Sequence, residues 1–400
     1  MIEENPMYTK RFQLKLDRDS ETPLNSWEIS NFINQLTSYY YKNELINAIS
    51  HALNNNISAE NIFILSESFS LNKTYEKIDI LNIPDDLLQL YYIGDPISLF
   101  PNRELFTLNL LFNMVRTINK TLYNNKPRLR LHNNIMIEIF KSYDQDFKNV
   151  TKFIFLQTKD LLYKVPHKTI QDKNLCETKL NQISKIISGY LNTFNDYESN
   201  KININSLTEY LMSDSDIKIE SKNFEVLKNK YFNKFLYYFS KVSRPVVGIH
   251  LEEERKIKII GKSHINKKIQ DELFFDTKSI THNSPLSALF EAGLGLGQLS
   301  IEQERLKLEK EKHEWERKKT NIELQTLELE KLNKQLEVQS KMELLLKKEG
   351  LDQIQNITNP YIKQNLIDTR KRIFEGYTTL VNKNELIVNR EETKIIDVSI

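Results

Sequence analysis

The sequence predicts a mixed α+β fold: one or two globular units, then a glycine-containing connector, a long charged helix and a short C-terminal helix and strand. Three observations support this prediction. Stretches with apolar residues at every second position alternate with stretches of helical spacing. Apolar residues make up 40% of the 400 residues, which is enough to build cores for two or three domains. Residues 298–349 contain neither Gly nor Pro, which predicts a long helix.

Residues 1–167 are predicted to form the first α+β domain. Its first strand is indicated by Phe12, Leu14 and Leu16, which lie on one face at period two. Its first helix carries Phe32 and Leu36 at helical spacing behind a capping residue at Ser26. The predicted elements are a strand at 8–16, a helix at 25–53, a strand at 61–69, a helix at 102–123, and strands at 133–140 and 151–158.

Residues 168–284 are predicted to form a second α+β unit. It begins with helices at 174–197 and 222–241, and the second of these is rich in aromatic residues. A β-hairpin is expected near residues 244–262, because Val247 and Ile249 alternate on one arm and Ile257 and Ile259 on the other. A further strand is expected within residues 271–283.

Residues 285–299 form an apolar connector that carries three of the nine glycines, Gly293, Gly295 and Gly297. As a helix, each of these glycines costs about 1 kcal/mol relative to alanine. We therefore interpret the segment as a hinge or as a connector whose backbone approaches its surroundings closely. The alternatives are a docking or oligomerisation surface and a membrane-inserting segment, although the segment is too short to span a bilayer alone.

The long helix at 300–349 carries one row of a heptad repeat, which includes Ile301 and Leu308. Its first half lacks the second row and is predicted to be a solvated, ion-paired rod. Its second half is predicted to be coiled-coil-like and to mediate homo-oligomerisation. The oligomerisation residues are Leu324, Leu327, Leu329, Leu332, Leu336 and Val338. The alternatives are fold-back onto a helix at 359–381 or contact with a different protein; residues 350–400 hold that helix and a final strand.

Overall composition limits the classes of partner and the compartment. The 56 Lys and Arg residues nearly balance the 54 Asp and Glu residues, so net charge does not drive binding to nucleic acid or to anionic membranes. The single cysteine, Cys176, forms no intramolecular disulfide, which favours the cytoplasm. Residues 1–12 lack the apolar core of a signal peptide, and no run of about 18 apolar residues occurs. No membrane partner is therefore expected.

The segment KPRLRLH is the one candidate for phosphate contacts. Lys126, Arg128 and Arg130 alternate along a short extended stretch and present three cations on one face. A solvated basic face accounts for the same pattern, because the chain holds 56 basic residues.

No catalytic residue, metal ligand or cofactor is predicted. Asp214 and Asp216 followed by Glu220-x-Lys222, and Glu254-x-Lys256, resemble the spacing of metal-dependent nucleases, but such triplets arise by chance in a chain this rich in Glu and Lys. The seven histidines are scattered, and the glycines lack the spacing of a phosphate-binding loop.

The leading hypothesis is a non-enzymatic cytoplasmic scaffold or adaptor. It would self-assemble through its C-terminal helical third and recognise a protein partner through the α+β body. The alternative is an effector that binds nucleic acid or cuts it as a metal-dependent nuclease, in a bacterial phage-defence system.

Overall fold

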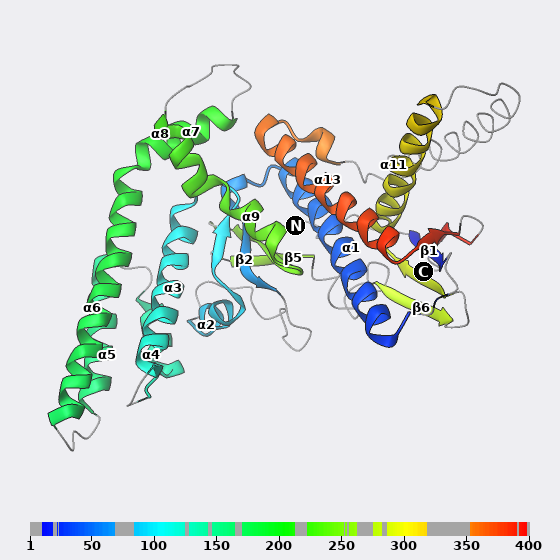
Figure 1. Ribbon diagram of the computed structural model, residues 1–400. Coiled ribbons are helices and arrows are strands. Elements are labelled where there is room, and N and C mark those ends of the chain that lie inside the picture. The colour runs from blue at the N-terminus through cyan, green and yellow to red at the C-terminus, as the bar shows by residue number, and fades with distance from the viewer. Residues whose placement is uncertain are drawn as a thin grey trace, which may run out of the picture. The chain divides into compact units, whose positions relative to one another are not determined.

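The computed structural model has a mixed α+β fold with long helices and two antiparallel sheets (Figure 1). The described residues are 10–18, 22, 24–68, 84–124, 128–142, 146–164, 170–212, 222–251, 253, 256–261, 275–281, 286–317, 353–389 and 392–397. The chain divides into two compact units. Unit 1 contains residues 1–56 and 261–400, and unit 2 contains residues 57–260.

In the part that the structure describes, unit 1 is a sheet packed with the helices α1, α11 and α13. Its elements are β1 (Lys10–Arg18), α1 (Ser26–Asn54), β6 (Asp276–Thr281), β7 (Ser287–Ala292), α11 (Gly295–Arg317), a 3-10 turn (Gln353–Asn356), α13 (Pro360–Lys383), β8 (Leu386–Val388) and β9 (Lys394–Asp397). Strand β1 pairs antiparallel with β7 on one side and with β8 and β9 on the other, and β6 lies outside β7. Helix α13 runs beside α1, and both contact α11 (Figure 1).

The elements of unit 1 begin where local chemistry sets their ends. The side chain of Asn25 accepts a hydrogen bond from the N–H of Glu28, and the Glu28 carboxylate accepts one from the N–H of Asn25, so a capping box starts α1. Asn359 caps α13, which has Pro360 in its first turn. On β1, Phe12 and its neighbours at period two are fully buried, which confirms the predicted strand.

Unit 2 combines a second sheet with a set of helices. Its elements are a 3-10 turn (Ala59–Asn61), β2 (Ile62–Ser68), α2 (Pro84–Ile93), β3 (Pro96–Ser98), α3 (Arg103–Tyr123), α4 (Asn133–Lys141), α5 (Phe147–Tyr163), α6 (Ile170–Ser199), α7 (Lys201–Met212), α8 (Lys222–Leu227), a π turn (Lys228–Phe232), α9 (Lys234–Lys241), β4 (Pro245–Leu251) and β5 (Lys256–Ile260). The sheet order is β3-β2-β4-β5, all antiparallel. The hairpin of β4 and β5 confirms the one predicted near 244–262.

The strands predicted at 133–140 and 151–158 are wrong, because these residues form α4 and α5. In the first segment Ile135, Ile137 and Ile139 alternate, which fits a strand. The residues that are buried, however, are Met136, Ile139 and Phe140, at the spacing of one helix face. Packing of α4 against α2 and α5 therefore selects the helical period.

The two units divide the chain differently from the linear order expected from the sequence. The expected boundary between residues 167 and 168 lies inside unit 2, where α5 and α6 pack together on either side of it. Strands β6 and β7, expected in the second unit and the connector, lie in the sheet of β1. Unit 1 is thus built from both ends of the chain, because the β1–β7 pairing joins residues far apart in sequence.

The predicted long helix is helical through Arg317 in the part that the structure describes. Its first half is not a fully solvated rod: Ile301 and Leu308 are buried, and α11 contacts β1, α1 and α13. Charged residues on the outer face form local pairs such as Arg305 with Glu302. The heptad row therefore packs inside unit 1 at this end. The predicted oligomerisation residues at 324–338 lie outside the described residues.

Candidate functional site

The three glycines expected in a connector lie where β7 passes into α11. The N–H of Gly293 donates to the Tyr40 hydroxyl at 2.9 Å, and the N–H of Gly295 donates to Oε1 of Glu44 at 2.8 Å. Both acceptors come from α1. Gly295 and Gly297 are already helical. The side chains of α1 thereby fix where α11 begins.

A buried polar network surrounds this junction. The side-chain amide of Asn43 donates to the carbonyl of Gly295 at 3.0 Å and to Oε1 of Gln298 at 2.7 Å. Arg370 on α13 donates to Oδ1 of Asn47. Buried polar groups of this kind require hydrogen-bond partners. The side-chain amides of α1 thus form hydrogen bonds with both α11 and α13.

The carboxyl group of Glu44 is buried in this network. Burial is the largest influence and raises the pKa of Glu44 from 4.5 to about 7, although hydrogen bonds from Asn47 and from the N–H of Gly295, and the charge of Arg370, lower it. Between these two pKa values the folded chain binds more protons at this site than the unfolded chain. Protonation of Glu44 therefore adds to the free energy of unfolding. This contribution is fully present below about pH 4.5 and is lost as the pH rises to about 7.

We expect Glu44→Gln to remove this pH dependence, because the amide keeps an acceptor for the Gly295 N–H and carries no charge. Unfolding free energies of both proteins should be measured in urea at about pH 5 and about pH 8. From the lower to the higher pH, the free energy of unfolding of the variant should rise relative to that of the natural protein by up to about 3 kcal/mol. One pKa unit corresponds to about 1.4 kcal/mol. If the two proteins differed in unfolding free energy by the same amount at both pH values, Glu44 would not be the source of the pH dependence.

The second candidate is an open groove of about 930 Å³ in unit 2, bounded by α2, α3 and α4. Helix α2 contributes Tyr91 and Tyr92 to its wall. The C-terminal part of α3 contributes Asn119, Lys120 and Tyr123. The remaining wall is Arg130, Leu131, His132, Asn133, Asn134 and Met136. The groove therefore combines aromatic rings, amides and cations.

Backbone and side-chain hydrogen bonds hold the segment that carries Arg130. The N–H of Leu129 donates to the carbonyl of Leu122 at 3.1 Å, and the N–H of Leu131 donates to Oδ1 of Asn119 at 2.8 Å. The Lys179 ammonium group on α6 is buried and also donates to the Leu122 carbonyl, at 2.8 Å. The segment is thereby fixed to the C-terminal end of α3.

Of the three predicted phosphate contacts, Arg130 lines this groove and Arg128 lies near the Tyr123 ring in its wall. The guanidinium carbons of Arg128 and Arg130 lie 5.6 and 4.4 Å from the centre of the Tyr123 ring. These are distances for cation–π contacts. Both arginines are exposed, and Arg130 lines the groove. Lys126 lies outside the described residues.

Tyr92 lines the groove from α2. Its hydroxyl donates to Oδ1 of Asn133 at 2.7 Å, which joins α2 to the start of α4. Its ring meets the Tyr91 ring edge-on, with centres 5.3 Å apart. The Tyr92 side chain is nevertheless 46% exposed and Tyr123 is 42% exposed. Both rings therefore present surface to a ligand while their positions are constrained.

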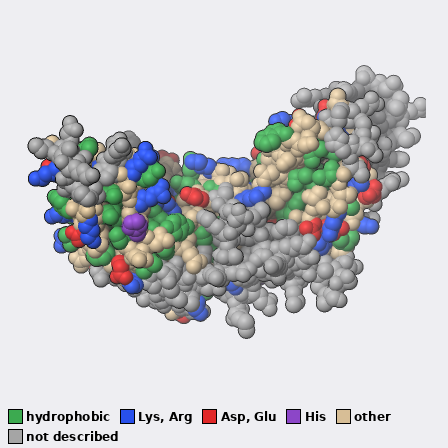
Figure 2. Space-filling view, turned by 90° about the horizontal axis from the view of Figure 1, so that it is seen from below, with side chains coloured by type: hydrophobic (Ala, Val, Ile, Leu, Met, Phe, Trp, Pro, Cys, Tyr) green, Lys and Arg blue, Asp and Glu red, His purple; other side chains and the backbone are tan. Residues whose placement is uncertain are grey.

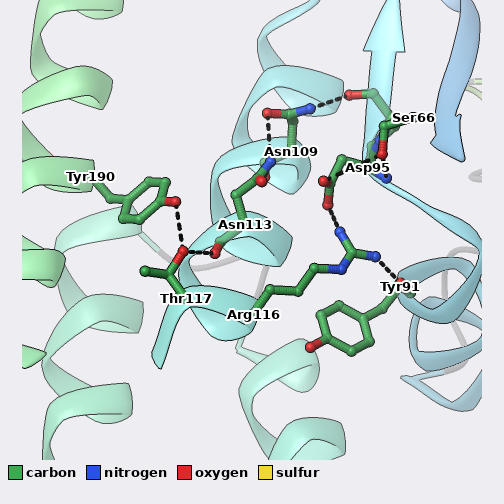
Figure 3. Close-up of polar contacts among 9 residues, drawn as sticks. Ser66, Tyr91, Asp95, Asn109, Asn113, Arg116, Thr117 and Tyr190 are labelled. Carbon is green, nitrogen blue, oxygen red and sulfur yellow. Dashed lines mark hydrogen bonds and ion pairs between the residues drawn. The ribbon is translucent and has the colours of Figure 1, made fainter. Parts of the chain in front are cut away.

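Arg116 on α3 lies between Asp95 and Tyr91, at the end of α2 (Figure 3). Its guanidinium group forms an ion pair with Asp95, donates to the backbone carbonyl of Tyr91, and lies 4.6 Å from the centre of the Tyr91 ring. Asp95 is held in turn by Ser66, whose hydroxyl accepts from the Asp95 N–H at 3.0 Å. Arg116 thus fixes the C-terminal end of α2, where Tyr91 and Tyr92 lie.

The electrostatics of the groove favour an anion. Lys120, Arg130 and His132 line it, and no Asp or Glu is among its described lining residues. His132 is the N-cap of α4 but makes no side-chain hydrogen bond to the first turn, so the positive end of this helix is not capped by that side chain. Figure 2 shows one face of the molecule, on which Lys and Arg side chains lie among hydrophobic side chains and a few Asp and Glu side chains.

Other classes of site receive no support in the described residues. No group of three or more His, Cys, Asp or Glu side chains there is placed to hold a metal ion. The nuclease-like carboxylates Asp214, Asp216, Glu220 and Glu254 lie outside the described residues. Among the described helices, none is both long and apolar enough to cross a membrane.

Comparison of the chain with known protein families, with curated proteins and with solved structures gave no match.

Proposed function

We propose that the chain is a non-enzymatic binding protein whose unit 2 recognises an anionic partner through the groove between α2, α3 and α4. The observation that carries the proposal is the composition of the wall: Lys120, Arg130 and His132 lie among three tyrosines, with no described acidic residue between them. Cations that face one groove attract phosphate or carboxylate groups and set the salt dependence of binding.

This proposal gives the adaptor hypothesis a defined recognition surface. The second half of the helix predicted at 300–349 keeps its proposed role, which is self-assembly through Leu324, Leu327, Leu329, Leu332, Leu336 and Val338. Cys176, the single cysteine, is buried and has no second cysteine in the chain with which to form a disulfide, which suits a reducing compartment such as the cytoplasm.

The proposal is tested by titrating the full chain with inorganic polyphosphate. We expect Lys120→Gln with Arg130→Gln to lower the affinity roughly tenfold and to reduce the slope of log affinity against log salt by about 2, because two phosphate contacts are lost. The matched control is Lys152→Gln with Lys159→Gln on α5, which removes the same charge outside the groove.

The control variant should bind polyphosphate as the natural protein does. Equal loss of affinity in both double variants would mean that binding follows net charge alone, and the groove would not be the site. Thermal unfolding of each variant checks that the fold is kept; Lys120 and Arg130 are exposed, so little change is expected.

A further inference from the structure

We propose that the anionic partner is single-stranded nucleic acid, with unpaired bases stacked on the exposed tyrosines and phosphates held by Lys120 and Arg130. This inference rests on the proposed function, because it names the partner of the same groove.

The exposed aromatic rings in the groove wall favour nucleic acid over a polyanion that has no bases. A phosphate chain needs cations but gains nothing from exposed rings, whereas each base that stacks on an aromatic side chain contributes about 1–3 kcal/mol. Tyr92 and Tyr123 both line the groove and are nearly half exposed. Exposing two large rings next to cations is the arrangement by which proteins bind single strands.

The rings are also held in place before a ligand arrives. Tyr92 is fixed by its hydrogen bond to Asn133 and by the edge of the Tyr91 ring. The Tyr123 ring carries Arg130 over it, and a guanidinium plane can itself stack on a base. Preorganised rings lose little conformational entropy on binding, which favours affinity.

Polar groups on the wall suit the edges of bases. Asn134 is exposed at the start of α4 and lines the groove, and a side-chain amide offers both donors and an acceptor to a base edge. The groove volume of about 930 Å³ lies near the top of the range of about 300–1,000 Å³ for pockets that hold drug-sized ligands. There is room for a short stretch of nucleotides.

A duplex fits this arrangement poorly. Its bases are stacked on one another and their faces cannot reach Tyr92 or Tyr123, so only its phosphates would contact the protein. Preference for a single strand over a duplex of the same sequence is therefore the signature of the proposed mode.

The experiment is fluorescence anisotropy with the full chain and labelled DNA and RNA single strands of about 15 nucleotides, a length that covers the usual site sizes. Duplex DNA, polyphosphate and polyglutamate serve as competitors. Tyr92→Leu should weaken single-strand binding roughly tenfold, the loss expected for one stacked base. Tyr92→Phe should lose clearly less affinity than Tyr92→Leu, because it keeps the ring that stacks and loses only the hydrogen bond to Asn133.

The matched control for the ring is Tyr163→Leu on α5, where Lys159 lies 5.8 Å from the centre of an exposed tyrosine ring outside the groove. This variant should bind single strands normally. Tyr92→Leu should weaken polyphosphate binding far less than single-strand binding, which separates stacking from charge. Tighter binding of either single-stranded DNA or single-stranded RNA supports the proposal and shows whether the ligand carries deoxyribose or ribose.

The outcomes separate the inference from the function on which it rests. If polyphosphate and single strands bind equally and Tyr92→Leu changes neither, the inference is overturned and the anion-binding function stands. Tighter binding of duplex overturns it as well, and tighter binding of polyglutamate points to an acidic protein instead. If no anion binds, both proposals fall.

Discussion

Replacing Gly297 by alanine is expected to destabilise unit 1 by about 1–3 kcal/mol, the usual cost of overpacking a core. A Cβ at this position would lie 2.7 Å from the ring of Phe12, which is fully buried at the centre of the sheet. Gly295→Ala should be similarly costly. Its Cβ would lie 2.2 Å from Oε1 of Glu44, the atom that accepts the Gly295 N–H.

These losses exceed the gain of up to about 1 kcal/mol in helix propensity that alanine brings. Urea unfolding followed by circular dichroism measures them. The control is Gly189→Ala on α6, where a Cβ meets open space, so this variant should be stabilised by up to about 1 kcal/mol.

If these glycines formed a hinge, the alanine variants would behave differently. In a hinge, alanine would favour a continuous helix and raise the far-UV helical signal with little loss of stability. In the structure α11 already begins at Gly295, so no such rise is expected. Gly297→Ala with unchanged stability and a higher helical signal would contradict the close-packed junction.

Replacing Arg116 by methionine is expected to cost unit 2 about 1–3 kcal/mol, less than the 3–5 kcal/mol typical of a fully buried pair. The expected loss is smaller because the pair is partly solvated: the Arg116 side chain is 27% exposed and that of Asp95 is 12% exposed. The variant leaves Asp95 without its guanidinium partner and releases the Tyr91 carbonyl. We also expect weaker ligand binding, because the end of α2 that carries Tyr92 loses its support.

Arg116→Lys distinguishes positioning from stability alone. Lysine restores a charge beside Asp95 but lacks the planar fork that reaches Asp95 and the Tyr91 carbonyl together. Unfolding free energy should therefore recover in part, while affinity for a single strand stays low. Full recovery of both would show that Arg116 acts by charge and does not orient the tyrosines.

Much of the fold follows from local patterns in the sequence. Strand β1, helix α3 and the hairpin of β4 and β5 could be predicted because each has one apolar face and a clear period. Helix α4 could not, because its isoleucines fit period two while Met136 and Phe140 fit the helical period, and only packing decides between them. The division into units could not be predicted either, because β1 pairs with β7 across most of the chain.

The groove was predictable only in part. Arg128 and Arg130 stand out because they are close in sequence. Tyr92 and Asn119 gave no comparable signal, because their role depends on contacts with residues far along the chain. The Tyr92–Asn133 bond joins positions 41 apart, and no local period encodes that distance. The adjacent tyrosines Tyr91 and Tyr92, shortly before Gly94, were the available clue.

The central claim is that the groove between α2, α3 and α4 holds a single-stranded ligand. Its most direct test is ultraviolet crosslinking of the full chain to single-stranded oligothymidine, followed by mass spectrometry of the crosslinked peptides. The account predicts that crosslinked bases map to Tyr92, Tyr123 and residues 128–134, and that these crosslinks are lost when Lys120 and Arg130 are both replaced by glutamine. Crosslinks confined to α5, or to unit 1, would contradict it.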